Sequence, residues 1–124
     1  MPHERDDADR AFLWDMLEAA RSVCALVAGM TFAQFQADRR TYRAVERELE
    51  ILGEAARNVS AELRSAHPRI PWVSIIGQRN VLAHQYGQIR LDLLWDTVTR
   101  SLPTLIAHLE PILPPPPPDP EPEP

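Results

Sequence analysis

Cysteine, glycine and long apolar runs are all scarce in this sequence of 124 residues. The single cysteine, Cys24, excludes an internal disulfide, and its apolar neighbours indicate a small buried side chain rather than a nucleophile. The four glycines form no phosphate-binding pattern. No apolar run reaches the length of a membrane span, and the N-terminus is too acidic for a signal peptide. We therefore expect a cytoplasmic protein that does not associate with membranes.

The charge balance argues against a general nucleic-acid binder. The formal net charge is −5, and it falls to −2 once three carboxylates near the C-terminus are set aside: Asp119, Glu121 and Glu123. Within nine residues the chain carries a cluster of four arginines, Arg39, Arg40, Arg43 and Arg47. These arginines could form a local basic surface. We favour the simpler interpretation that they pair on a helix face with Glu46, Glu48 and Glu50.

Apolar residues recur at the three- and four-residue spacing of amphipathic helices. The spacing predicts long helices over 7–29, 39–58, from 72 towards 84, and 90–110. Short helical turns should begin at Thr31 and Ser60, and Asp38 should cap the second long helix. Gly29 suits a helix end, Pro71 suits a first helical position, and Pro103 should kink the last helix. No stretch alternates apolar and polar residues over a length that would indicate a strand. We therefore predict an all-α antiparallel bundle of four to five helices.

The composition changes abruptly at Pro111, which divides the chain into a helical domain, 1–110, and a tail, 111–124. Nine of the last 14 residues are proline. Such a segment cannot form a core, and we expect a disordered, acidic tail with polyproline II character. An inert, solubilising tail is the favoured interpretation, and a proline-rich ligand for a partner is the alternative.

The stretch 77–87 gathers an arginine, an asparagine, a histidine and a tyrosine: Arg79, Asn80, His84 and Tyr86. On a helix Asn80 and His84 share a face, and the long Arg79 side chain can reach towards His84. Histidine can accept or donate a proton near neutral pH, and arginine binds phosphate oxygens bidentately. These groups meet the needs of metal-free RNA cleavage by the 2′-hydroxyl. The spacing alone also fits a helix-capping histidine and a surface arginine.

Arg79-x4-His84-x-Tyr86 resembles the R-x4-H-x-Y motif of the HepT-like branch of the HEPN superfamily. The similarity extends to Pro71-Trp72 and Ile75-Ile76-Gly77 ahead of the motif. It also includes Glu46 and the segment Leu52-Gly53-Glu54-Ala55. The resemblance covers roughly residues 7 to 110, and the proline tail lies outside it.

This resemblance implies a metal-independent endoribonuclease toxin of a type II or type VII toxin–antitoxin module. It implies a homodimer that brings two motifs to one cleft, an RNA substrate, and a minimal nucleotidyltransferase of the MntA type as antitoxin. Arg79 and His84 would be catalytic, Asn80 would orient the site, and the antitoxin would neutralise the toxin by adding AMP to Tyr86. The resemblance implies no cofactor. The alternative function is a non-catalytic HEPN module that binds a nucleotidyltransferase partner, and a helical dimerisation module without an RNA role is a third.

Other side chains that could carry chemistry have simpler interpretations. The histidines outside the motif, His3, His67 and His108, show no metal-ligand spacing, so we expect no metal site. The tryptophans lie on apolar faces and should pack in the core or at a dimer interface: Trp14, Trp72 and Trp95. Glu54 could reach the cleft, although pairing with an arginine such as Arg57 or Arg79 is the favoured interpretation.

Overall fold

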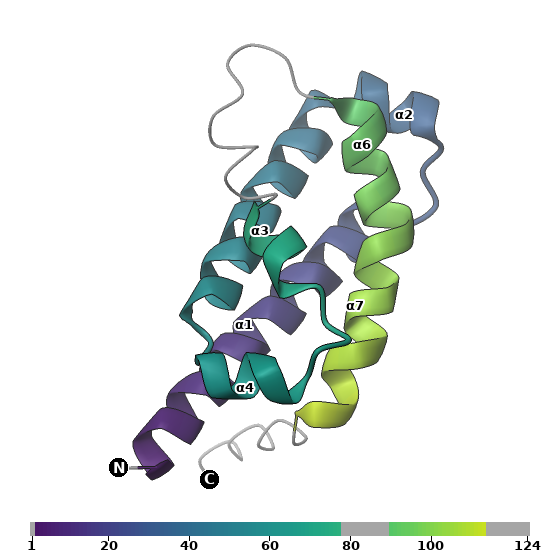
Figure 1. The fold of residues 1–124 in the computed structure, drawn as a ribbon. Coiled ribbons are helices and arrows are strands. Elements are labelled where there is room, and N and C mark those ends of the chain that lie inside the picture. The colour runs from purple at the N-terminus through teal and green to yellow at the C-terminus, as the bar shows by residue number, and fades with distance from the viewer. Residues whose placement is uncertain (1, 78–89, 114–124) are drawn as a thin grey trace, which may run out of the picture.

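Three long helical segments run side by side in the computed structural model, which describes residues 2–77 and 90–113 (Figure 1). They are α1 (Pro2–Val27), α3 (Arg39–Asn58), and a last segment built from α6 (Leu91–Asp96), the π-helical η1 (Thr97–Ser101) and α7 (Leu102–Leu109). The described chain ends in a 3₁₀ turn, η2 (Glu110–Ile112). Helix α1 packs along both α3 and α7. The described residues contain helices and no strand, which confirms the predicted all-α bundle.

Shorter helices close the two ends of the bundle. Helix α2 (Phe32–Ala37) packs against α3 and α6 at one end, and α4 (Ala61–Ala66) lies near the other (Figure 1). A further helical stretch, 72–77, begins the segment that leads to the motif. Within the described residues no helix is both long and apolar enough to cross a bilayer.

The helix boundaries follow local side-chain chemistry. The Thr31 hydroxyl accepts a hydrogen bond from the Gln34 backbone, and the Gln34 side chain accepts one from the Thr31 backbone, which makes a capping box. Asp38 caps α3 through the Thr41 N–H at 3.1 Å. Gly29 has a φ of +77° just beyond the end of α1, a conformation that glycine adopts at little cost. The predicted caps and the predicted helix end are therefore confirmed.

Three predicted details differ from the structure. The first helix, predicted over 7–29, spans Pro2–Val27. The helix at 72–77 starts one residue after Pro71, whose carbonyl accepts from the Ile75 N–H at 3.0 Å, so Pro71 is the cap rather than the first helical residue. The irregularity expected at Pro103 lies in the preceding turn, as the π-helix Thr97–Ser101. Pro103 has no N–H that could donate to the preceding turn. In that turn the Leu102 N–H donates to the Thr97 carbonyl, five residues earlier, which is the π-helical pattern.

One apolar core joins all these elements. Met16, Val23, Phe35, Val45 and Leu109 are fully buried, and the core extends to Leu113 at the end of the described chain. All three tryptophans belong to the core or pack against it, as predicted. Cys24 is half-buried beside the core, and burial raises the pKa of its thiol, which reduces its reactivity as a nucleophile.

Candidate functional site

The four motif residues lie in the stretch 78–89, outside the described residues. The prediction that Arg79, Asn80, His84 and Tyr86 form one site is therefore neither confirmed nor contradicted by the structure. The structure does describe the chain on both sides of this stretch and the helix faces nearby. These flanking parts place the two ends of the motif segment in the bundle.

The chain that leads into the motif is held by the core. Ile70 and Trp72 are buried, with 3% and 7% of their surfaces exposed. The Trp72 indole Nε1–H donates to the His67 carbonyl at 3.0 Å, and the Trp72 backbone N–H donates to the Ile70 carbonyl at 2.9 Å. Ile75 and Ile76 then pack partly buried against the core. The motif segment therefore starts from a fixed anchor, although Trp72 itself has no reactive group.

The chain that leads out of the motif is held at the end of the bundle where α6 packs against α2 (Figure 1). Arg90 precedes α6 and pairs with Asp92 at 3.0 Å. The Arg90 hydrogen bond lowers the pKa of the exposed Asp92 carboxyl, and Asp92 in turn raises the pKa of Arg90. Leu94 of α6 is buried, and the ring centroid of Trp95 lies 5.0 Å from that of Phe35. The motif segment thus connects two packed elements, the 72–77 helix and α6.

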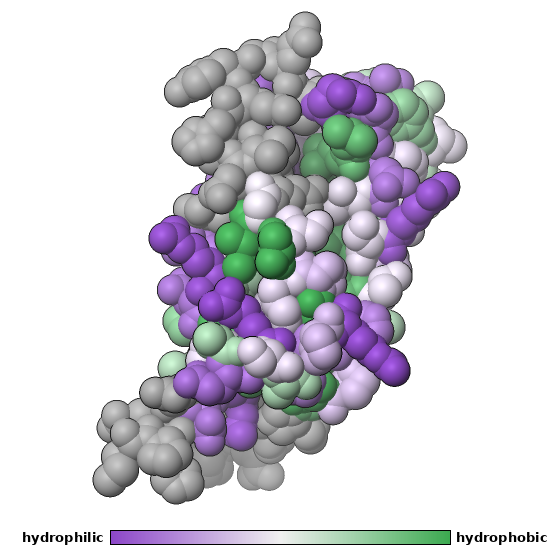
Figure 2. All heavy atoms as spheres, viewed as in Figure 1, coloured by the Kyte–Doolittle hydropathy of each residue, from purple (hydrophilic) through white to green (hydrophobic). Residues whose placement is uncertain are grey.

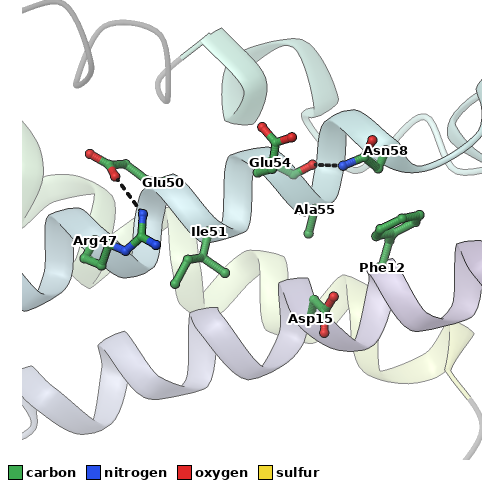
Figure 3. A pocket seen from close by; sticks show the side chains of 8 residues that line it. All are labelled: Phe12, Asp15, Arg47, Glu50, Ile51, Glu54, Ala55 and Asn58. Atoms are coloured by element: carbon green, nitrogen blue, oxygen red, sulfur yellow. Dashed lines mark hydrogen bonds and ion pairs between the residues drawn. The ribbon is translucent and has the colours of Figure 1, made fainter.

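A cavity of about 550 Å³ lies between α1 and α3 (Figure 3). Its described lining combines polar and apolar residues of the two helices: Phe12, Asp15, Arg47, Glu50, Ile51, Glu54, Ala55 and Asn58. Three carboxylates and one arginine give this described lining an acidic character.

Two of the four arginines in the cluster at the start of α3 form ion pairs with glutamates of the same helix. Arg43 bonds to Glu46 and Arg47 bonds to Glu50, each at 3.3 Å and each along one helix face. Arg43 also lies 5.9 Å from the centroid of the Tyr42 ring. The interpretation that these arginines pair with neighbouring glutamates is therefore confirmed for Arg43 and Arg47. Partial burial raises the pKa of the Glu46 carboxyl, although Arg43 acts in the opposite direction.

One residue with a clear structural role was not identified from the sequence. Asp9, with 4% of its surface exposed, is the buried charged residue of the described chain. Its carboxylate accepts hydrogen bonds from the Ser60 backbone N–H at 2.8 Å and from the Ser60 hydroxyl at 2.6 Å. No local pattern could reveal it, because its partner lies 51 residues away. Elsewhere in the described chain, no three His, Cys, Asp or Glu side chains are grouped to hold a metal ion.

These features define the class of the protein as an all-α helical bundle whose motif segment joins two core-anchored helices. The family model for the ribonuclease HepT-like proteins matches residues 16–112, and the chain belongs to this family. The matched range includes the whole Arg79-x4-His84-x-Tyr86 motif. Membership in a ribonuclease family gives the enzyme class, an RNA-cleaving hydrolase.

Similar proteins in other organisms carry consistent names. The chain is 36% identical over 104 residues to a Methanocaldococcus jannaschii protein named "Putative RNase MJ0127", a match that covers 84% of this chain and 86% of that protein. It is 34% identical over 99 residues to a Thermococcus cleftensis protein named "Probable ribonuclease HepT", covering 80% and 90% of the two chains. No solved structure is significantly similar to the chain.

Proposed function

We propose that this protein is a metal-independent endoribonuclease that acts as the toxin of a toxin–antitoxin module. The observation that carries the proposal is the family match over residues 16–112, within which the arginine, histidine and tyrosine of the motif are all present. A purely structural bundle has no need of all three side chains. The names of the similar proteins, which refer to RNases, support the same substrate class.

The proposed chemistry uses Arg79 and His84. His84 removes the proton of an RNA 2′-hydroxyl, and the resulting oxygen attacks the adjacent phosphorus. The O2′–P bond forms and the P–O5′ bond breaks, which leaves a 2′,3′-cyclic phosphate on one fragment and, after protonation, a 5′-hydroxyl on the other. Arg79 stabilises the charge that builds up on the phosphate oxygens, and Asn80 orients the two groups.

We propose that two chains form a twofold dimer and that the cleft lies at their interface. Two copies of the motif in one cleft would supply a second histidine to protonate the leaving 5′-oxygen. The cognate partner would be a minimal nucleotidyltransferase that transfers AMP from ATP to the Tyr86 hydroxyl oxygen and releases pyrophosphate. The adduct would add bulk and about one negative charge close to the arginine that receives the RNA phosphate.

Alanine substitutions test the catalytic assignment. His84→Ala should reduce cleavage of a fluorescent RNA by about 10²–10⁴-fold, the usual loss when a proton-transfer group is removed. Arg79→Ala should reduce it by about 10²–10³-fold, the usual loss when a group that stabilises transition-state charge is removed. His108→Ala and Arg100→Ala are matched controls of the same residue types outside the motif, and both should cleave at the wild-type rate. Circular dichroism should show the same helix content in all four variants. Full activity of His84→Ala would refute the assignment.

A further inference from the structure

Two adjoining hollows lie where the connection after α4 meets the end of α7. The first has a volume of about 440 Å³ and the second about 720 Å³. Pro68 and Ile70 line both, so the hollows form one continuous surface, which we name the α4–α7 groove. The residues that the argument uses are Arg64, His67, Arg69, Val73, His108 and Ile112.

Part of the groove is apolar and open to solvent. Val73 at the start of the 72–77 helix has 87% of its surface exposed, and Pro68 and Pro71 are exposed beside it. Figure 2 shows a green, hydrophobic patch near the middle of this face, with purple, hydrophilic side chains to its left and below it. An exposed apolar strip with a polar rim is typical of a surface that binds another chain.

The side chains of the groove that are charged at neutral pH, Arg64 and Arg69, are both positive. His67 and His108 also line it, and no acidic side chain does so within the described part of the chain. The groove is therefore suited to a ligand that brings negative charge.

The chain itself supplies such a ligand at the edge of the groove. Pro111 and Ile112 line the first hollow, and Leu113 is the last residue of the core. The next eleven residues are Pro114–Pro118 followed by Asp119, Glu121 and Glu123 alternating with prolines. This sequence has many carbonyl acceptors, few N–H donors and three negative charges. As polyproline II it could span about 34 Å.

We propose that the segment 114–124 binds in the α4–α7 groove of its own chain. The prolines would contact the apolar strip at Pro68, Pro71 and Val73. The carboxylates would face Arg69 and the two histidines. Polyproline II is already ordered before binding, so little entropy is lost. The covalent link also gives the segment a millimolar effective concentration at the groove.

Paramagnetic relaxation in the full chain tests this binding. A nitroxide on Pro120→Cys, in a Cys24→Ala background, should broaden the amide signals of Arg64, Ser65, Val73 and Ser74. Signals of α2, at the other end of the bundle, should stay sharp. Broadening spread evenly over the surface, or concentrated on another face, would overturn the proposal.

Charge reversal separates specific binding from simple proximity. Arg69→Glu should reduce the bound-to-free ratio of the segment by about two- to fivefold, as expected for an exposed ion pair, and Glu121→Arg in the same chain should restore part of it. Arg100→Glu is the matched control, and it should change nothing. Equal broadening in Arg69→Glu and the parent would contradict the proposal.

A mixed sample distinguishes binding within one chain from binding between chains. Isotope-labelled chains without nitroxide are mixed with unlabelled chains that carry it. Sharp signals at Val73 and Ser74 in the mixture support binding within one chain. Broadened signals there would show that the segment binds a second copy, which would overturn the proposal as stated.

Discussion

Single residues fix the geometry at the junction of α3 and α4. The Asp9 carboxylate accepts two hydrogen bonds from Ser60, and the Ser60 hydroxyl also accepts one from the Leu63 N–H at 3.2 Å. The sequence predicts that Ser60 caps this turn but gives no indication that a carboxylate of α1 holds the cap in place. Asp9 thus joins the first helix of the chain to the segment that precedes the motif.

Asp9→Ala should lower the free energy of unfolding by about 1–3 kcal/mol, because the partly buried Ser60 N–H would lose its acceptor. Urea unfolding followed by circular dichroism measures the change. Asp7→Ala, at an exposed position of the same helix, is the matched control and should fall within about 0.5 kcal/mol of the wild type. If Asp9→Ala lowered the free energy of unfolding no more than Asp7→Ala does, the hydrogen bonds to Ser60 would make no net contribution to stability.

Tyr86 and Tyr42 are the two tyrosines of the chain. Coexpression with a minimal nucleotidyltransferase, the partner proposed above, should add the mass of AMP to the wild type and to Tyr42→Phe but not to Tyr86→Phe. Tyr86→Phe should retain much of the cleavage activity, because the proposed proton transfer uses no phenol. Intact-mass measurement and peptide mapping give the result. An adduct on Tyr42, or a Tyr86→Phe protein that the partner's catalysis still silences, would contradict the regulatory part of the proposal.

At the level of elements, the sequence predicts the helices and their caps well because these depend on neighbouring residues. Thr31, Asp38 and Ser60 each bond to a backbone N–H within three residues. The π-helical turn at Thr97–Ser101 could not be located in advance. Pro103 indicates that a helix is disturbed, but the packing of Val98 and Leu102 in the core decides which turn absorbs the disturbance.

Gly29 provides a direct test of the turn between α1 and α2. Gly29→Ala should lower the free energy of unfolding by about 1–2 kcal/mol, because a Cβ disfavours its φ of +77°. Among the described residues, and apart from adjacent residues and the helix's own backbone, no atom lies within 4 Å of the added Cβ at Gly29 or at Gly77. The φ of Gly77 is not positive. Gly77→Ala is therefore a matched control that adds the same methyl group without the backbone strain expected at Gly29. Equal effects of the two substitutions in urea unfolding would rule out backbone strain as the cause.

At the scale of the whole molecule, the sequence predicts the bundle and the family but not every surface. The helical spacing of the apolar residues is enough to predict a bundle, because the apolar face of each helix must be buried against other helices. The charge signs along α3 indicate the ion pairs of Arg43 and Arg47. By contrast, the acidic cavity between α1 and α3 combines residues of two helices, and its position depends on how they pack. The residues of the candidate site stay a prediction from the motif.

The proposed active-site cleft lies at the interface of a twofold dimer, so it requires two chains. Multi-angle light scattering at micromolar concentration should give about twice the 14.1 kDa mass of the chain, because a twofold pair would cover exposed apolar side chains such as Leu93 and Ile51. A monomer with full ribonuclease activity would exclude a cleft shared between chains.

The most direct test of the central claim is the identity of the RNA ends formed in the presence of EDTA. The wild type should cleave RNA at an undiminished rate and leave 2′,3′-cyclic phosphate or 3′-phosphate ends, because the 2′-hydroxyl is the nucleophile. His84→Ala should leave the RNA intact. Loss of activity with EDTA that magnesium restores, or products with 5′-phosphate ends, would contradict the account. An inactive wild type would point instead to a non-catalytic module.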